Sequence, residues 1–533
     1  MIDILIIGSG GAGLTAALAA KDTEASVTVV GKTYPTNSQT SMAQGGMNAA
    51  LGNVGKDQVS SHIADTIKSA RGLCDEKMVQ KMCSDAPQSI QWLESIGVPF
   101  SRLDNGRSGK DTIAQRQMGG ASAKRACYAQ DYTGLKILHT LYDTCLKNNI
   151  DFLDEHYLLN LIIQDKMVTG ATFLDIRTGE VKQVNAKSVI IATGGYGSLY
   201  HGYTTNAYGS TGDGVAAVLR AGGAVSDMEF VQFHPTALKG SSILISESAR
   251  GEGGYLVNTK GERFVDELKP RDVVARAIFT EFQKGQEVFL DVRHLGEEKL
   301  MELLPQEVEL CKLHEHVDPA TELIPIKPVA HYSMGGIDVD NTLEVNGIKG
   351  CFAVGECSNA KVHGANRLGG NSLLEITAFG KVAGENASNH AKSIVPHETN
   401  NHQLQQDKHY LENLYAKDHT INFYEKRESL GKIFYEKVGI VRDNAQLLEA
   451  METLNVIGAS HRDMGPADKS PTNNTNLIDF LEFSNVLQLA PTIISAALTR
   501  DESRGAHFKI GFESLDDEKF KMHIVSHLDK DIE

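Results

Sequence analysis

The 533-residue sequence lacks the cysteine patterns that identify disulfide-rich proteins and metal clusters. Its seven cysteines are odd in number and scattered along the chain, so they do not indicate a disulfide framework. No C-x-x-C pair occurs, and the sequence therefore offers no recognisable ligand set for an iron–sulfur cluster or a zinc ion. We predict reduced cysteines and no metal site.

Long apolar runs are absent as well. The sequence contains no stretch of about 18 apolar residues of the kind that crosses a bilayer. Its first residues resemble a strand, and they show no charged segment, apolar stretch and cleavage site of an export signal. We therefore expect a cytoplasmic chain that does not itself span a membrane.

Positive charge is scarce, because 52 Lys and Arg residues stand against 68 Asp and Glu residues and give a formal net charge of −16. Binding to nucleic acid requires a basic face that meets the phosphate backbone, so we expect no nucleic-acid partner. A local group of cationic side chains around a small anion is compatible with this balance, since net charge describes the surface as a whole.

Glycine, in contrast, is abundant at 50 residues, and its first cluster follows a predicted strand. Residues 2–7 are a short apolar run typical of a buried parallel strand, residues 12–20 indicate a helix, and residues 26–30 indicate a second strand. The turn Gly8-Ser9-Gly10-Gly11-Ala12-Gly13 fits the G-x-G-x-x-G pattern of dinucleotide-binding proteins. There the first glycine permits a tight turn, the second admits a pyrophosphate and the third lets helix and strand pack closely.

Further signals favour FAD over NAD as the dinucleotide. The second strand ends in Gly31-Lys32, where NAD-binding proteins carry an acidic residue that bonds the ribose. The turn ATGG (192–195) follows a predicted strand at 189–192, and Gly355-Glu356 follows another at 350–355. These turns provide additional backbone approaches to an extended ligand, so the sequence predicts an FAD site.

The order of these segments indicates several domains, as the chain length also does. Residues 227–341 have their own strand and helix signals and interrupt the dinucleotide-binding segments, so we assign them to an inserted domain. Residues 393–410 are polar and suit a linker, and residues 411–500 show helical patterns. We predict an FAD-binding domain at 1–226 and 342–392, an inserted domain at 227–341 and a C-terminal helical domain at 393–533.

Specific motifs then connect the chain to a known family. They occur in the order SMAQGGMNAALG (41–52), STGDG (210–214), EFVQFHPTAL (229–238), SESARGEGGYL (246–256), PRDVVARAI (270–278), HYSMGGI (331–337), VHGANRLGGNSLLE (362–375) and ESRGAH (502–507). With these motifs the sequence resembles the flavoprotein family of succinate dehydrogenase, fumarate reductase and L-aspartate oxidase. The resemblance covers nearly the whole chain.

The resemblance implies a fold and a set of cofactor contacts. The expected fold is α/β, with a Rossmann-like FAD-binding domain, an inserted α+β capping domain and a C-terminal helical domain. The expected FAD contacts are Gly8, Gly10, Gly11, Ala12, Gly13, Lys32, Ser38, Gln39, Thr40, Gly45, Gly46, Asp213, Glu356, Arg367, Ser372 and Leu373. Ser372 and Leu373 are expected to open a helix directed at the isoalloxazine ring.

The resemblance also implies a C4 dicarboxylate substrate and the interconversion of fumarate and succinate by hydride transfer at flavin N5. The matching substrate positions are His234, Ser246, His331 and Arg367, with the backbone at Gly120 as a further candidate. Arg367 offers a planar fork that suits a carboxylate. The family position of the proton donor is Arg271, and Glu247 and Arg250 match its relay. If the segment of these two is helical, their spacing of three places them on one face.

Two positions distinguish the chain within the family. The membrane-bound members attach flavin covalently to a histidine, and the matching stretch here reads Asn37-Ser38-Gln39-Thr40, so we expect non-covalent FAD and a bias toward fumarate reduction. L-aspartate oxidase also lacks that histidine and is the alternative, but its members carry a glutamate where this chain has Met118. A thiol-dependent fumarate reductase and a non-catalytic flavin module are further alternatives.

The origin of the electrons lies outside this chain, because the sequence carries no cluster ligands of its own. The resemblance implies an iron–sulfur subunit as partner, with a membrane-anchor subunit as a further expected partner. Through such partners the chain would lie at the cytoplasmic face of the inner membrane.

Overall fold

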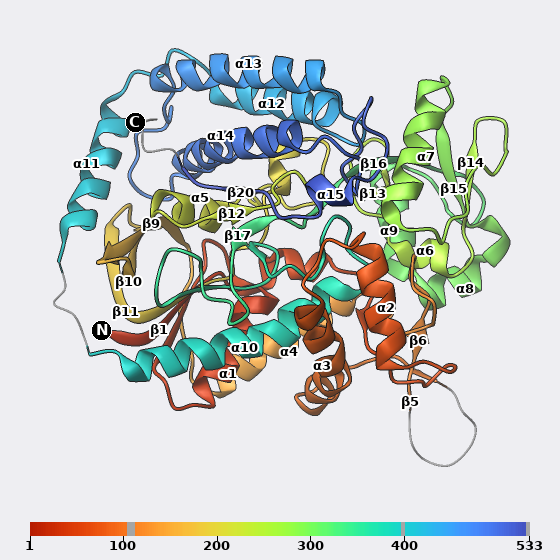
Figure 1. Ribbon diagram of the computed structural model, residues 1–533, viewed down its shortest axis with the longest axis horizontal. Coiled ribbons are helices and arrows are strands. Elements are labelled where there is room, and N and C mark those ends of the chain that lie inside the picture. Colours follow the sequence, from red (N-terminus) through yellow and green to blue (C-terminus); the bar gives the residue numbers. More distant parts are fainter. Residues whose placement is uncertain (104–111, 396–399, 529–533) are drawn as a thin grey trace.

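The computed structural model describes residues 1–103, 112–395 and 400–528 (Figure 1). Its central sheet is parallel and has the strand order β8-β2-β1-β11-β18. The bounds of these strands are β1 Ile2–Ile7, β2 Val27–Val30, β8 Asp151–Leu153, β11 Val181–Ile191 and β18 Cys351–Ala353. The strands predicted at 2–7, 26–30 and 350–355 are thus confirmed with bounds that differ by at most a few residues, and the strand predicted at 189–192 is the end of the longer β11.

Strand β11 belongs to two sheets. Its second half pairs with β1, and its first half pairs antiparallel with β10 (Met167–Asp175), which in turn pairs with β9 (His156–Gln164). Helix α1 (Gly11–Lys21) follows β1 and packs on α10 (Asn371–Ser393), and both cover one face of the central sheet (Figure 1). The α/β fold class and the predicted first helix are confirmed.

Other elements of this region surround the sheet. They are β3 Met47–Asn48, α2 Val59–Ser69, α3 Glu76–Ser95, β4 Arg102–Leu103, β5 Thr112–Ile113, β6 Gln115–Arg116, β7 Ala126–Cys127, α4 Thr133–Lys147 and α5 Asp213–Arg220. Short 3-10 turns occur at Pro35–Asn37, Gln39–Met42 and Gly197–Tyr200.

The capping region occupies one side of the molecule, shown in green in Figure 1. Its sheet has the antiparallel order β13-β16-β15-β14, with β13 Val231–Leu238, β16 Ile324–Ser333, β15 Val288–Asp291 and β14 Tyr255–Asn258. Its helices are α6 Glu247–Gly251, α7 Arg271–Gln283, α8 Glu297–Leu303 and α9 Pro305–His314. A separate cluster of buried apolar residues lies within this region, which fits an inserted domain, while the domain boundaries remain our assignment.

The two passages between the capping region and the rest of the chain lie side by side. Strand β12 (Val225–Ser226) leads into the region and pairs with β17 (Gly336–Asp338), which leads out of it. Strands β19 (Ser358–Asn359) and β20 (Val525–Ser526) complete this small sheet, so the end of the described chain is attached to the same junction.

The C-terminal helices lie mainly across the top and along the left side of the molecule in Figure 1. They are α11 His402–Ala416, α12 Phe423–Lys437, α13 Asn444–Ser460, α14 Thr475–Thr499 and α15 Asp517–Phe520. Helix α14 is long and apolar enough to cross a membrane, yet 61% of that stretch is buried inside the protein, as in the core helix of a globular domain. The linker expected at 393–410 is too long, because α11 already begins at His402, and residues 396–399 lie outside the described residues.

Candidate active site

A cavity runs from the glycine-rich turn after β1 to the inner face of the capping region. Most of the residues predicted for the cofactor and the substrate line it: Gly8, Gly10, Gly11, Ala12, Lys32, Ser38, Gln39, Thr40, Gly45, Gly46, Asp213, His234, Ser246, Glu247, Arg271, His331, Glu356, Arg367, Ser372 and Leu373. Gly13, Gly120 and Arg250 are not among the lining residues. Segments far apart in sequence therefore meet in one space.

The glycine turn is shaped for a close approach of backbone and ligand. Gly8 has a φ of +115°, and a Cβ there would lie 2.1 Å from the carbonyl oxygen of Ala192, so only glycine fits. Beyond Gly10 and Gly194 the space is open toward the cavity, with atoms of the described chain no nearer than 3.5 Å to a Cβ placed at Gly10. Gly10, the N-cap residue of α1, makes no side-chain cap within the described chain, so N–H groups of the first turn other than that of Gly11 are left for a ligand.

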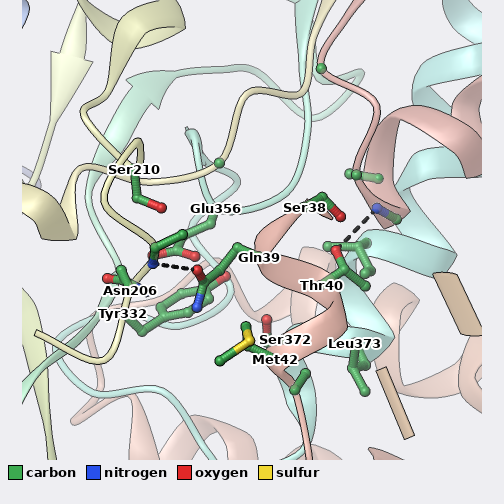
Figure 2. Close-up of a pocket in the computed structure, with 18 of the residues that line it drawn as sticks. Ser38, Gln39, Thr40, Met42, Asn206, Ser210, Tyr332, Glu356, Ser372 and Leu373 are labelled. Atoms are coloured by element: carbon green, nitrogen blue, oxygen red, sulfur yellow. Dashed lines mark hydrogen bonds between the residues drawn. The ribbon is translucent and has the colours of Figure 1, made fainter. Parts of the chain in front are cut away.

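Polar atoms around this turn are available to a ligand. The hydroxyls of Ser38 and Thr193 are buried and have no hydrogen-bond partner within the described ranges. Thr40 accepts a hydrogen bond of 3.1 Å from the amide of Gly11 (Figure 2). The unpaired hydroxyls of Ser38 and Thr193 fit the polar parts of a dinucleotide, because leaving buried hydroxyls unsatisfied costs free energy. The residues present therefore fit FAD.

Gln39 also lines this space. Its Oε1 accepts a hydrogen bond of 2.8 Å from the backbone amide of Ala207, drawn as a dashed line in Figure 2. Asn206, Ser210 and Met42 lie near it in the same view. The side chain thus connects the 3-10 turn Gln39–Met42 to the loop that precedes α5.

Lys32 contacts several polar partners at the cavity. It lines the cavity, but its ammonium donates to Asp213 at 2.6 Å, to Glu482 of α14 at 2.7 Å and to the carbonyl oxygen of Gly209. Burial would lower the pKa of Lys32, yet the two carboxylates outweigh it and raise that pKa. Asp213, at the start of α5, thus brings a carboxylate to the end of β2.

Glu356 and the start of α10 line the cavity beside the glycine turn. Glu356 accepts a hydrogen bond of 3.0 Å from the amide of Ser333, and burial raises its pKa to about 7. Helix α10 begins at Asn371, so Ser372 and Leu373 lie in its first turn, as predicted, and both face the cavity (Figure 2).

Arg271 lies at the start of α7, where it meets two partners. Its Nη2 and Nε both donate to Glu247 Oε2, at 2.7 and 3.1 Å, and its Nη1 donates to Gln232 Oε1 at 3.0 Å. The second oxygen of Glu247 accepts from the amide of Gly119 at 3.0 Å. Both charged side chains are at most 6% exposed, so this ion pair is held in a fixed orientation at the cavity wall.

Arg250 extends this pair away from the cavity. Glu247 and Arg250 both belong to α6, as the predicted helical spacing requires, and Arg250 Nη2 lies 3.6 Å from Glu247 Oε1. Burial would raise the pKa of Glu247, but Arg271 and Arg250 lower it, so the carboxylate stays charged. Burial lowers the pKa of Arg250.

Two imidazoles face each other across the same space. The rings of His234 and His331 are 4.9 Å apart between centroids, and His331 Nδ1 lies 2.7 Å from the hydroxyl of Thr205. Burial and the charge of Arg271 hold the pKa of both histidines well below the usual value, so both are neutral at physiological pH.

Arg367 completes this group of cavity residues. Its guanidinium lies 4.2 Å above the ring of Tyr332, and its Nε is buried without a hydrogen-bond partner in the described part of the chain. Burial lowers the pKa of Arg367 to about 10. Tyr332 in turn donates to Glu375 at 3.0 Å, so the ring that supports Arg367 is itself fixed. Its place in the motif HYSMGGI, beside His331, was the available signal for Tyr332, but we did not assign it a role from the sequence.

The comparisons with known proteins agree with this geometry. Residues 3–373 match the family description "FAD binding domain", and residues 427–533 match "Fumarate reductase flavoprotein C-term". The chain is 40% identical to the 8-methylmenaquinol:fumarate reductase flavoprotein subunit of Wolinella succinogenes, over 99% of this chain and 88% of that protein. It is 39% identical to the succinate dehydrogenase flavoprotein subunit of Coxiella burnetii, over 98% and 94%.

Solved structures give the same result. A mutated E. coli quinol fumarate reductase FrdA chain superimposes with a TM-score of 0.94 at 37% identity, over 99% of this chain and 95% of that chain. Adenylylsulfate reductase of Archaeoglobus fulgidus, at 17% identity and a TM-score of 0.80, shares the fold alone. The alternative of L-aspartate oxidase is not indicated by these relatives. This chain is an FAD-binding oxidoreductase that belongs to the family of fumarate reductase and succinate dehydrogenase flavoprotein subunits.

Proposed function

We propose that this chain binds a C4 dicarboxylate between the FAD cavity and the capping region and interconverts fumarate and succinate. The observation that carries the proposal is the meeting of a fixed Arg271–Glu247 ion pair, two neutral imidazoles and the buried guanidinium of Arg367 in one cavity. Buried cationic groups around an open space favour a small anion with more than one carboxylate.

Each carboxylate of the substrate would have its own donors. Arg367 offers a buried Nε without a partner among the described residues, and Ser246 lines the cavity at the N-terminus of α6. If the Thr205 hydroxyl donates to Nδ1 of His331, the Nε2–H of the same imidazole is left to donate into the cavity. Gripping both ends of the substrate fixes the double bond in one orientation, which contributes to the rate.

FAD, when bound and reduced, supplies a hydride to one carbon of fumarate. The other carbon requires a proton, and Arg271 is placed to give it. An arginine is a weak acid, so its proton must be replaced at once. Glu247, which accepts from both Nη2 and Nε of Arg271, is in position to return the proton, and Arg250 is the next group along α6.

We further propose that the cofactor is bound without a covalent link, because Gln39 has no ring nitrogen that could be alkylated. The expected result is that acid precipitation releases the flavin into the supernatant and leaves a colourless pellet. The measurement is the absorbance of both fractions near 450 nm. A yellow pellet after washing in denaturant would contradict the proposal, and a family member with the linking histidine serves as the positive control.

The direction of the reaction follows from the same feature. Within the family, loss of the covalent link goes with a bias toward fumarate reduction, so we expect initial rates of fumarate reduction with a reduced dye to exceed those of succinate oxidation.

Aspartate should give no turnover, because the buried, apolar Met118 lines the cavity and offers no charge to an ammonium group. Turnover with aspartate above that with fumarate would overturn the assignment.

Partners are proposed from the relatives. Those relatives are flavoprotein subunits, and the solved structure titled quinol–fumarate reductase with menaquinol superimposes with a TM-score of 0.93. We infer that an iron–sulfur subunit delivers electrons to this chain and that a membrane-anchor subunit places it at the cytoplasmic face of the inner membrane. Co-purification of the tagged chain with an iron-containing polypeptide tests this.

A further inference from the structure

A buried group of three ionisable side chains lies against the N-terminus of α6 and has no part in the reaction proposed above. Glu307 comes from the first turn of α9, Arg116 from β6 and Asp131 from the segment before α4. All three are less than 5% exposed. The three residues form one buried cluster.

Glu307 connects this cluster to the substrate cavity. Its Oε1 accepts a hydrogen bond of 2.8 Å from the backbone amide of Ser246. Ser246 lines the cavity, and its hydroxyl accepts from the amide of Ser248 as the cap of α6. The carboxyl group of Glu307 therefore fixes the backbone of the residue that we assign to a substrate carboxylate.

Asp131 holds Glu307 in place, and Arg116 lies against an aromatic ring. Asp131 Oδ2 accepts from the amides of Gln306 at 2.8 Å and of Glu307 at 3.2 Å, which fixes the first turn of α9. The guanidinium of Arg116 lies 3.6 Å above the ring of Tyr128. The charges of Asp131 and Arg116 both act on Glu307, with opposite effects on its pKa.

Each member also keeps a buried polar atom without a hydrogen-bond partner among the described residues. These atoms are Glu307 Oε2, Asp131 Oδ1 and Arg116 Nε and Nη1. A charged carboxylate with a single hydrogen bond is costly to bury, so the geometry favours the uncharged form of Glu307.

We propose that uncharged Glu307 positions Ser246 for a substrate carboxylate and that ionised Glu307 opposes binding of the dicarboxylate, so that this side chain sets the alkaline limit of substrate affinity. The inference rests on the proposed function. Its physical basis is repulsion between a buried negative charge and a dianionic substrate in a medium of low dielectric constant.

The charges around Glu307 agree with such a role. Burial and, to a smaller extent, Asp131 raise the pKa of Glu307, the hydrogen bond from the Ser246 amide and the charge of Arg116 lower it, and the net result is a pKa of about 8. On its own helix, burial raises the pKa of the Cys311 thiol, so that group stays neutral. On α6, the charges of Glu247 and Arg250 are opposite and adjacent. Glu307 thus keeps its proton at pH 7 and loses it in mildly alkaline solution.

Binding of malonate, a dicarboxylate that cannot be reduced, tests the inference in the FAD-loaded protein through the flavin absorbance. In the unchanged protein Kd should rise about 5-fold between pH 7 and pH 9 and approach a 10-fold rise at higher pH, as expected when binding raises the pKa of Glu307 from about 8 by about one unit. In Glu307→Gln the amide oxygen still accepts from Ser246, and the rise should fall below about 2-fold. Glu309→Gln, an exposed residue of α9, should behave as the unchanged protein and is the matched control.

Thermal unfolding gives a second readout. A carboxyl group whose pKa is raised on folding stabilises the protein below its ordinary value of 4.5, and this contribution is lost as pH rises to about 8. The Tm of Glu307→Gln should therefore increase relative to the unchanged protein from pH 5 to pH 8.

An equal rise of Kd in Glu307→Gln and the unchanged protein overturns this inference alone. Failure of malonate to bind at pH 7 instead overturns the proposed function.

Discussion

Replacement of Arg271 by Gln should lower kcat for fumarate reduction by about 10³- to 10⁴-fold, at the upper end of the effect of removing a general acid. The side chain of Gln can still hydrogen-bond to Glu247, so the wall of the cavity is preserved. Its amide, however, does not release a proton on the time scale of turnover. The defect should therefore appear in kcat and leave FAD bound.

The geometry explains why so large an effect is expected from one side chain. Arg271 is the group that joins Glu247 to the cavity, because its Nη2 and Nε contact Glu247 Oε2 while its Nη1 contacts Gln232. Without it the carboxylate of Glu247 keeps only the Gly119 amide and the more distant Arg250 as described partners. The relay then ends before it reaches the substrate.

Initial rates with a reduced dye, together with malonate binding and flavin content, measure this prediction. Arg293→Gln is the matched control, since Arg293 is an exposed arginine of the same region that pairs only with Asp291 among the described residues. It should retain full activity. A kcat of Arg271→Gln within 10-fold of the unchanged protein would show that another group donates the proton.

The parts of the fold that the sequence predicts well depend on neighbouring residues. A short apolar run, a glycine turn and an Ala-rich segment determine β1 and α1 within some 20 residues, and both appear as expected. The helical spacing of Glu247 and Arg250 is equally local, and α6 places them 3.6 Å apart. Motif residues were found for the same reason, since each lies in a continuous stretch with its own pattern.

Contacts between segments far apart in the sequence were not predicted. Lys32 and Glu482 are separated by 450 residues, and no pattern around either one indicates that their side chains meet. Glu307 is similar: it lies in a helix whose sequence is unremarkable among surface helices, yet it reaches the amide of Ser246. Only the folded chain shows which acidic residues are buried and which are solvated.

The misplaced linker has a different cause. Helix α11 is so polar that its sequence indicated a loop, and its buried positions are Asp407, Leu411 and Leu414. Their spacing of four and three is helical, but one of the three is an acid. Asp407 is buried because it accepts hydrogen bonds from Asn160 and Thr172 of the neighbouring sheet, a pairing that composition cannot indicate.

Replacement of Gly13 by Ala should abolish FAD binding, lowering affinity by more than about 100-fold, although the change adds a single methyl group. A Cβ at Gly13 would lie 1.9 Å from the carbonyl oxygen of Gly8 and 3.4 Å from the Cβ of Ala192. The obstacle is the carbonyl group of Gly8 in the turn after β1, and a backbone atom cannot rotate away as a side chain can. Helix α1 must therefore shift from β1, which displaces the N–H groups that we assign to the pyrophosphate.

The same substitution at Gly458 provides the matched control, because this glycine is also helical but exposed near the end of α13. A Cβ there meets no atom of the described chain within 4 Å. Since Ala favours a helix more than Gly, Gly458→Ala should leave FAD binding unchanged and stabilise the protein by up to about 1 kcal/mol. Gly13→Ala should lower the free energy of unfolding by about 1–3 kcal/mol, the usual cost of overpacking. Flavin absorbance per protein and denaturant unfolding measure both variants, and a yellow Gly13→Ala protein with normal flavin content would show that α1 does not hold the cofactor as proposed.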